Sequence, residues 1–474
     1  MKNFFNNGNV IRLMALIVLL FVAVSCSKDS GPIVVPGKSY NNDITGFIFK
    51  RSDNPSLTAD CTPFIDGDLL YITVPEGTDI TSLKPELTVS PKSTITINGS
   101  PVQGSPGAMN FSEIVRIKVT AEAGNSRTYR LLVQPGRDNI DRMVYAFMSK
   151  FSIPGVSVAI SKDERVVYKT GLGFAITEDE TRTKPNHLFR LASISKQFTT
   201  LCIMKLIEAG KLTVESKVFG EGGILESEFS NVPPKASTVT IRHLLEHTSG
   251  WRSDPDPMFT SSFKGQTLDQ RIVYVLNSAQ NDPGTAYSYF NMGFGILGKV
   301  VEKLSGKNFE AFLKEVLLEA GVNDIHVGGD RAARRANEVV YYSQSGTNGY
   351  GNEMDVIAAA GGIIASTEQM MKVLFHIDGL TDIPDIISAS TRTTMLTPSS
   401  VYNRYALGWR TNHSYYPNSW YHGGNLAGTA VIWVMGPSIN CVILCNSRSY
   451  ITGFDDELYG LIKDIINSAH GMVW

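Results

Sequence analysis

The pattern of apolar and polar residues divides the chain into two regions with different predicted structures. Between residues 44 and 135, short apolar runs alternate with polar positions as in half-buried strands, and turn residues separate the runs. The clearest runs lie at residues 70–74, 94–97, 115–119 and 129–133. Runs of strand length at this spacing predict a small antiparallel β sandwich.

The region after residue 136 has a mixed pattern of helices and strands. Apolar residues recur with helical spacing over 138–150. Strand-like runs follow at 156–160, 165–170, 428–435 and 440–446. Further stretches with helical spacing lie at 193–209, 292–304, 309–318 and 454–469. We therefore predict an α/β domain over 138–474, with an antiparallel sheet built from both ends of the domain, flanking helices and an inserted, largely helical region.

The first 26 residues have the pattern of a secretory signal. Lys2 and Arg12 precede an apolar run over 15–24, and Cys26 follows directly after it. This ending resembles a bacterial lipobox, in which the cysteine becomes the lipidated first residue of the mature chain. We therefore expect a protein exported and anchored by lipid to a bacterial membrane, at the periplasmic side or the cell surface. An ordinary membrane anchor with an incidental cysteine is the alternative.

Residues 27–43 are polar, contain glycine and proline, and predict a flexible linker. In the region 44–135, the phrases Leu83-Lys84-Pro85 and Asn98-Gly99-Ser100-Pro101 resemble Ig-like modules of bacterial surface lipoproteins. No Ser/His/Asp or metal-ligand cluster occurs there, so we interpret this region as a spacer or binding module, and a stalk without a ligand is the simpler alternative.

Charge and cysteine content exclude some classes of function. The formal net charge of the 474 residues is -2, and no basic run occurs, so nucleic acid is not an expected partner. The cysteines after Cys26 do not form a disulfide framework. Two of them lie four positions apart in one apolar run, about 13 Å along a strand, which is too far to bridge. We interpret all four as core residues: Cys61, Cys202, Cys441 and Cys445.

A serine and a lysine three positions apart form the first candidate for catalytic chemistry. Ser193 and Lys196 begin a stretch with helical spacing, so both side chains lie on one helix face. A serine hydroxyl needs a group that accepts its proton, and a lysine whose pKa is lowered by burial can serve. The alternative is a capped helix with a solvated lysine. Ser195 is a poorer nucleophile candidate, because adjacent helical residues do not face each other.

Two later segments carry further candidates. Tyr289 and Asn291 lie two positions apart, so both point to the same side of an extended segment, where a phenol could pass protons and an amide could orient a substrate. Asn291 could instead cap the following helix. His422-Gly423-Gly424-Asn425 precedes the last strands. There the glycines permit close approach of a ligand backbone, and His422 could donate to a substrate carboxylate or be a turn residue.

The order Ser-x-x-Lys, Tyr-x-Asn and His-Gly-Gly resembles the serine β-lactamase and penicillin-binding protein superfamily. The similarity is greatest to class C β-lactamases, DD-peptidases and their esterase relatives, and it covers residues 138–474. Supporting phrases occur in the same order: His243-Leu244-Leu245-Glu246-His247-Thr248-Ser249-Gly250, Pro283-Gly284, Gly361-Gly362-Ile363-Ile364-Ala365-Ser366 and Leu407-Gly408-Trp409.

The resemblance implies Ser193 as the acylated nucleophile, with Lys196 and Tyr289 sharing the acid–base work. It implies substrate contacts by Asn291, His422, Gly424 and Asn425. The backbone N–H groups of Ser193 and Asn425 would form the oxyanion hole. True β-lactamases usually have Lys-Thr-Gly where this chain has His422-Gly423-Gly424, which argues against efficient β-lactam hydrolysis.

The predicted function is acyl transfer to water, without a cofactor or metal, on a β-lactam, a D-alanyl peptide, an ester or an amide. Two alternatives belong to other classes. One is a non-catalytic surface binding protein that retains the fold. The other is a zinc peptidase, because His243-x-x-Glu246-His247 matches the H-x-x-E-H pattern of some zinc enzymes. The resemblance makes that segment a structural helix end instead.

Overall fold

The computed structural model describes residues 36–472, and the chain folds into two compact units. The first unit comprises the residues up to Ile72 together with Gly77–Gln134. The second comprises Thr73–Glu76 and the chain from Pro135 onward. The predicted signal segment, Cys26 and residues 27–35 of the predicted linker lie outside the described residues. No helix among residues 36–472 has the length and apolar character that crossing a membrane requires.

The N-terminal region is rich in strands, as predicted. Two strands pair antiparallel with each other, and six others form a sheet in the order β2-β3-β8-β7-β5-β6. The Asn98-Gly99 pair, with φ angles of 48° and 85°, closes the β5–β6 hairpin, a backbone conformation that these two residue types favour. The strands are β1 Ile44–Ile48, β2 Phe64–Asp66, β3 Leu69–Pro75, β4 Glu86–Val89, β5 Thr94–Ile97, β6 Ser100–Val102, β7 Val115–Thr120 and β8 Ser126–Gly136.

A seven-stranded sheet organises the second unit, in the order β11-β10-β9-β19-β18-β17-β16. The segment after the first helix supplies three strands and the C-terminal segment supplies four, and β9 pairs antiparallel with β19 at the join. The prediction of one antiparallel sheet built from both ends of the domain is therefore confirmed. The strands are β9 Gly155–Lys162, β10 Arg165–Ile176, β11 Thr181–Arg182, β16 Arg410–His413, β17 Tyr416–Leu426, β18 Thr429–Met435 and β19 Ile439–Cys445.

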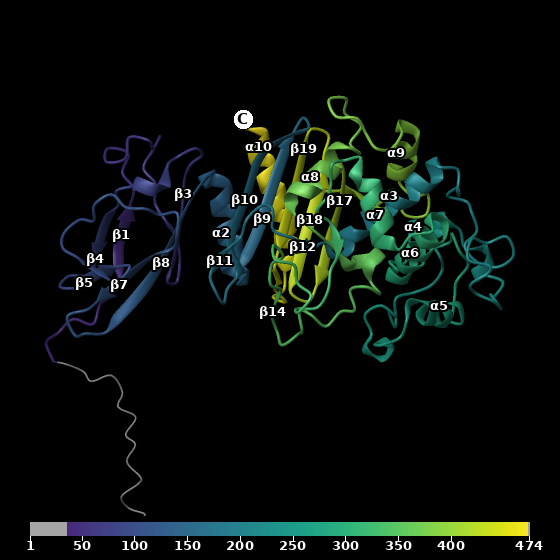
Figure 1. Cartoon of the computed structure of the whole chain (residues 1–474), viewed down its shortest axis with the longest axis horizontal. Helices are drawn as coiled ribbons and strands as arrows, with labels where there is room; N and C mark the ends of the chain where they lie inside the picture. Colours follow the sequence, from purple (N-terminus) through teal and green to yellow (C-terminus); the bar gives the residue numbers. More distant parts are fainter. Residues whose placement is uncertain (1–35, 473–474) are drawn as a thin grey trace, which may run out of the picture. The chain divides into compact units, whose positions relative to one another are not determined.

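Helices cover both faces of this sheet (Figure 1). Helices α2 and α10 pack against each other on one face, and α8 lies on the other, where the helices of the inserted region follow. The helices are α2 Asp138–Phe151, α3 Ser195–Glu208, α4 Ile241–Leu245, α5 Leu268–Leu276, α6 Asn291–Ser305, α7 Phe309–Leu318, α8 Thr367–Phe375, α9 Ala389–Leu396 and α10 Phe454–His470. Short strands complete the unit: β12 Phe189–Arg190, β13 His326–Val327, β14 Tyr342–Ser343, β15 Ile363–Ala365 and β20 Ser447–Arg448.

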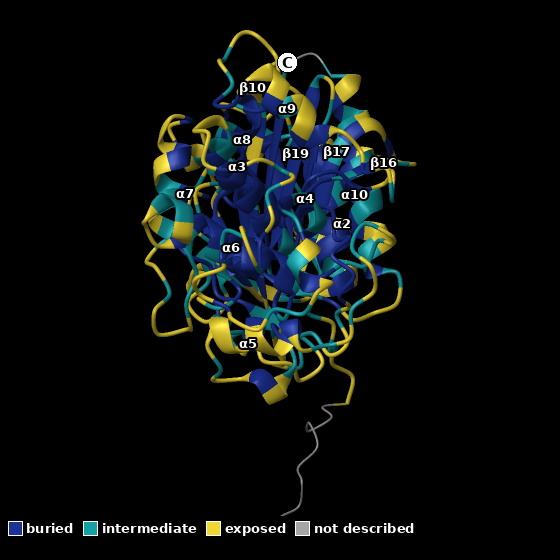
Figure 2. Cartoon of the chain, turned by 90° about the vertical axis from the view of Figure 1, so that its right-hand side faces the viewer, coloured by how far each residue is buried: buried dark blue, intermediate teal, exposed yellow. Residues whose placement is uncertain are grey.

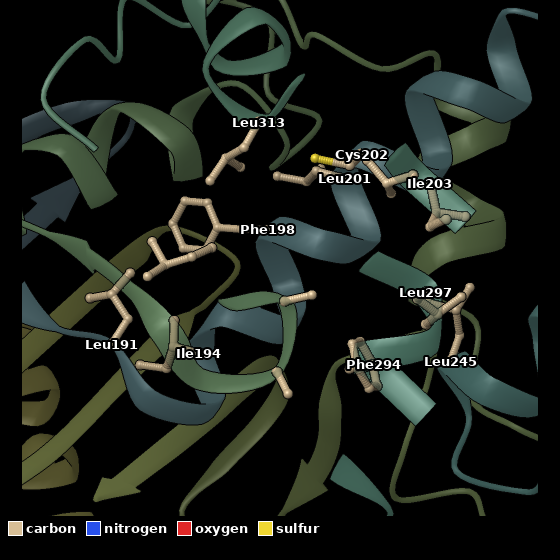
Figure 3. Packing of buried hydrophobic residues seen from close by; sticks show 14 of the residues in the cluster. Leu191, Ile194, Phe198, Leu201, Cys202, Ile203, Leu245, Phe294, Leu297 and Leu313 are labelled. Carbon is tan, nitrogen blue, oxygen red and sulfur yellow. The ribbon is translucent and has the colours of Figure 1, made fainter. Parts of the chain in front are cut away.

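The central strands and α3 are buried, whereas α5 carries many exposed residues (Figure 2). Helix α3 lies in the buried apolar core, where Phe198, Leu201 and Ile203 are fully buried. Phe294 and Leu297 of α6 belong to the same core (Figure 3). Because α3 is packed among apolar side chains, the turn that precedes it is held against β17 and β18. The four cysteines Cys61, Cys202, Cys441 and Cys445 are all buried.

Candidate active site

Ser193 lies in a tight turn between β12 and α3. The predicted helix over 193–209 begins later than expected, because Ala192–Ile194 forms a 3-10 turn and α3 starts at Ser195. Ala192 has a φ of 46°, in the left-handed region that residues with a Cβ rarely adopt. Such local strain persists only where the surrounding structure enforces it. The turn leaves Ser193 partly exposed while its neighbours Ala192 and Ile194 are fully buried.

Gly424 of β17 holds this turn in place. A Cβ on Gly424 would lie 2.5 Å from the Leu191 carbonyl oxygen and 2.9 Å from the Ala192 Cβ, so only glycine lets the strand approach the turn so closely. Gly424 is buried and does not line the pocket, whereas Gly423 does. The close approach at Gly424 is therefore made to the protein's own backbone, and a contact between Gly424 and substrate stays a prediction.

Lys196 is the residue whose chemistry changes most on folding. It has no exposed surface, and its Nζ lies 3.2 Å from Ser193 Oγ and 2.7 Å from the carbonyl oxygen of Ala360. Burial lowers the pKa of Lys196 from its ordinary value of 10.5 to about 7; the charge of Asp256 opposes this shift and that of Arg410 adds to it. Near pH 7 a large fraction of this side chain is therefore neutral and can accept a proton from Ser193.

Tyr289 lies beside this pair as a neutral phenol. The Lys196 ammonium is 4.9 Å from the centre of the Tyr289 ring. Burial raises the pKa of Tyr289 well above its ordinary value, and the nearby Ser193 hydroxyl and Arg410 act in the opposite direction without overcoming it. The hydroxyl is buried and makes no hydrogen bond of normal geometry among the described residues. Tyr289 therefore keeps its proton at neutral pH, whereas Lys196 can accept one.

Asn291 and Ser195 are both engaged with other protein groups. Asn291 is the first residue of α6, and its Nδ2 donates to Asp256 Oδ2 at 2.7 Å. The alternative prediction that Asn291 caps this helix is wrong, because Phe290 is the capping residue and no side chain caps the helix. Asn291 lines the same pocket as Ser193. Ser195 is buried, and its Oγ accepts the backbone N–H of Ile363 at 3.1 Å. Ser193 is therefore the serine that faces the pocket.

His422 is placed differently from its predicted role. It is buried, its Nδ1 lies 2.6 Å from the carbonyl oxygen of Gly423, and its Nε2 lies 3.2 Å from the hydroxyl of Tyr405. Burial and the charges of Arg410 and Lys196 hold the pKa of His422 well below its ordinary value. Because both ring nitrogens already have protein partners, His422 has no free donor for a substrate carboxylate.

Ser193, Tyr289, Asn291 and His422 line a pocket of about 540 Å³. Strand β16 pairs with β17 only as far as Arg410 opposite Tyr421. Within residues 36–472, this edge of β17 has no strand beside it after Tyr421, and it borders the pocket. Asn425 lies on this edge and is exposed. The lining residues are Ser193, Phe259, Tyr289, Asn291, Asn352, Gly361, Arg410, His422, Gly423, Asn425, Leu426, Ala427, Arg448, Tyr450 and Tyr459.

Arg410 is the main site residue that the sequence analysis missed. Its guanidinium lies 5.7 Å from the ring centre of Tyr289 and 5.9 Å from that of Tyr405. In the part of the chain that the structure describes, no carboxylate forms an ion pair with it, whereas Arg448 in the same pocket is paired with Asp455 at 2.9 Å. Arg410 directly follows the phrase Leu407-Gly408-Trp409, and that proximity was the available signal.

The residues of the zinc-like pattern do not converge. His243 Nδ1 accepts the backbone N–H of Thr240 at 3.2 Å in the cap of α4, while His247 Nδ1 accepts that of Phe290 at 3.0 Å. Glu246 accepts hydrogen bonds from Ser399 and Arg242. Over residues 36–472, no three His, Cys, Asp or Glu side chains are arranged to hold a metal ion. The segment is the end of a short helix, as the resemblance implies.

The beta-lactamase family matches residues 140–461, more than half of the chain. The chain belongs to the beta-lactamase family. A second family, described as SGBP, N-terminal, matches residues 67–133. This beta-lactamase family member is 23% identical over 335 residues to Protein flp of Staphylococcus aureus (strain N315), covering 67% of this chain and 64% of that protein.

Two further proteins are similar to this chain. Penicillin-binding protein 4* of Bacillus subtilis (strain 168) is 30% identical over 276 residues, which cover 52% of this beta-lactamase family member and 58% of that protein. The chain thus spans less than two thirds of the length of both curated relatives. A class C beta lactamase from Rhodobacter sphaeroides is similar in structure, with a TM-score of 0.57, 18% identity and coverage of 70% and 100% of the two chains. At this identity the likeness concerns the fold.

Proposed function

We propose that this protein is a serine hydrolase that acts through an acyl-enzyme on Ser193. The observation that carries the proposal is the buried Lys196 ammonium 3.2 Å from Ser193 Oγ. A lysine kept from solvent and with a pKa of about 7 is a base matched to neutral pH. An intact Ser193, Lys196 and Tyr289 argues against the alternative of a non-catalytic binding protein, which has no need of all three.

The proposed reaction has two halves. Ser193 Oγ bonds to the substrate carbonyl carbon while its proton passes to Lys196 Nζ. The carbonyl oxygen becomes an oxyanion, which the backbone N–H groups of Ser193 and Asn425 stabilise. The leaving alcohol or amine departs with a proton delivered through Lys196 and Tyr289, leaving an ester on Ser193. Water then attacks this ester, gives its proton to the same base, and releases the acid and the free hydroxyl.

Arg410 supports a substrate that carries a carboxylate close to the bond that is broken. A guanidinium is always charged and binds carboxylates through paired hydrogen bonds. Arg410 lines the pocket without an acidic partner among residues 36–472, so an anionic substrate group would supply the missing charge. Among esters, peptides and amides, we therefore favour those with a free carboxylate, such as a peptide with a D-alanyl terminus.

Labelling with a fluorophosphonate and with a labelled penicillin, followed by mass spectrometry of the intact and digested protein, tests the nucleophile. We expect the label on Ser193. Ser193→Ala should abolish labelling and lower ester turnover by several orders of magnitude, and the double variant with Lys196→Ala should be little worse than either single one. Ser195→Ala is the matched control and should still be labelled. A folded Ser193→Ala variant with wild-type turnover would refute the proposal.

Arg410→Gln tests the substrate class with two substrates of the same leaving group, one neutral and one with a carboxylate. We expect KM for the anionic substrate to rise about 10- to 100-fold, because a hydrogen bond to a charged group contributes about 1.5–3 kcal/mol. KM for the neutral substrate should change little. Equal effects on both substrates would contradict the role of Arg410 as a carboxylate receptor.

We also propose that the protein is exported and held at a bacterial membrane by lipid on Cys26, with the N-terminal β region acting as an Ig-like spacer or binding module. The signal-like pattern of residues 1–26 and the match of residues 67–133 to SGBP, N-terminal, support this arrangement. An anchored hydrolase would reach substrates in the periplasm or at the cell surface. Small molecules or peptides would then be its partners, and nucleic acid would not.

A further inference from the structure

A buried chain of hydrogen bonds runs behind the candidate active site. The Phe290 backbone N–H lies 3.0 Å from His247 Nδ1, and His247 Nε2 lies 3.1 Å from the Tyr405 hydroxyl. The same hydroxyl lies 3.2 Å from His422 Nε2, and His422 Nδ1 lies 2.6 Å from the Gly423 carbonyl oxygen. His247, Tyr405 and His422 are each at most 1% exposed, so water does not interrupt the chain.

The two backbone ends of the chain determine the position of every proton in it. The Phe290 N–H can only donate, so His247 Nδ1 carries no proton and His247 Nε2 carries one. The Gly423 carbonyl can only accept, so His422 Nδ1 carries a proton; because the ring is neutral, His422 Nε2 then carries none. Tyr405 therefore accepts from His247 and donates to His422. The two histidines are neutral and in opposite tautomers.

This chain of hydrogen bonds connects two walls of the pocket that are far apart in the sequence. At one end it fixes the segment from Ser288 to Phe290: the His247 carbonyl accepts the Ser288 N–H at 2.8 Å, and the His247 ring lies 4.3 Å from the Tyr289 ring. At the other end it fixes the start of the open β17 edge at His422 and Gly423. Tyr405 also forms an isolated β-bridge with Arg410.

We propose that His247 and Tyr405 are positioning residues that lock His422 as the neutral Nδ1–H tautomer and thereby set the distance between Tyr289 and the β17 edge. This role rests on the proposed hydrolase function. It assigns His422 to the scaffold of the pocket and gives His247 of the His243-x-x-Glu246-His247 pattern a purpose other than metal binding.

The surrounding charges favour the neutral form of both rings. The charged neighbours of His422 are Lys196 and Arg410. The titratable neighbours of His247 are the same two residues and His422. The rings of Tyr287, Tyr289 and Phe294 complete the surroundings of His247. These neighbours provide no carboxylate to stabilise an imidazolium. A proton added to His247 Nδ1 would oppose the Phe290 N–H, and one added to His422 Nε2 would oppose the Tyr405 hydroxyl proton. Either event would break this chain of hydrogen bonds.

The nitrogen NMR shifts of the wild-type protein labelled with 15N-histidine test the tautomers without reference to activity. We expect His247 with its proton on Nε2 and His422 with its proton on Nδ1, and neither ring should titrate between pH 5.5 and 8.5. Assignment follows from the single variants His247→Gln and His422→Gln. An imidazolium or an Nε2–H tautomer at His422 at pH 7 would overturn the proposal, even if Ser193 were labelled as proposed.

Tyr405→Phe tests the functional consequence, because it removes only the oxygen that joins the two rings. We expect kcat for a generic ester to fall about 10- to 100-fold, as for other small misplacements of reacting groups. The His422 ring should lose its single tautomer in the same variant. The matched control is Tyr402→Phe. The Tyr402 ring stacks on Tyr287 with ring centres 4.3 Å apart, and Tyr402 is not part of the chain of hydrogen bonds, so this variant should keep wild-type kcat. A Tyr405→Phe variant with wild-type kcat would overturn the proposal.

Discussion

Replacing Lys196 with methionine should make the catalytic unit more stable while abolishing turnover. The pKa of Lys196 falls from 10.5 to about 7 on folding because the ammonium is buried. Each pKa unit corresponds to about 1.4 kcal/mol, so the buried ammonium costs about 5 kcal/mol of stability below pH 7. Methionine leaves the Ala360 carbonyl without its donor, which costs about 1–3 kcal/mol. The net gain at pH 6 is therefore about 2–4 kcal/mol.

The sign of this effect follows from proton binding. Between pH 7 and 10.5 the unfolded state binds a proton at Lys196 that the folded state does not, so the stability of the wild type rises with pH across this window. The advantage of Lys196→Met should then shrink by about 1.4 kcal/mol per pH unit above pH 7 and reverse between about pH 8.5 and 10. Subtracting the two proteins at each pH cancels the contributions of their other titrating groups.

Urea denaturation followed by tryptophan fluorescence measures the difference in the free energy of unfolding between the two proteins, and it does so for the catalytic unit. All five tryptophans lie at or beyond residue 251, so the signal reports the catalytic unit alone. Lys211→Met is the control, because Lys211 is exposed and the same replacement there removes a lysine without removing a buried ammonium. A Lys196→Met difference that is flat from pH 6 to 10, or a variant less stable than wild type at pH 6, would refute the buried-base reasoning.

Three further predictions concern the site and the anchor. The value of kcat/KM for a neutral ester should rise with pH through about 7, because Lys196 must lose its proton to act as a base; a profile that is level from pH 5 to 9 would contradict this. Gly424→Ala should lower kcat about 100-fold by displacing the Ser193 turn. Gly460→Ala, where a Cβ meets nothing within 4 Å, should keep the wild-type kcat, and equal kcat values for the two variants would contradict the role of Gly424. Cys26→Ala should release the protein from membranes or leave its signal uncut, and unchanged partition and processing would end the lipoprotein proposal.

The sequence alone was enough to predict the fold class of the second unit. Helical and strand periodicities are local, so the strands at 156–160 and 428–435 and the helix at 309–318 could be predicted from short windows of residues. The spacing of Ser193 and Lys196 also implies proximity, because positions three apart on a helix are neighbours. The order of the motifs then indicated the family, and the family match over 140–461 bears this out.

Tertiary structure alone decided the chemistry of the individual side chains. Whether Lys196 is hydrated or buried depends on which distant residues cover it, and its pKa follows from that covering. The same holds for His422, whose nitrogens are occupied by Tyr405 and Gly423, and for Gly424, whose missing Cβ makes room for Leu191, 233 positions earlier in the chain. Local patterns specify helices and strands, but desolvation and hydrogen-bond partners come from contacts between segments that only the folded chain brings together.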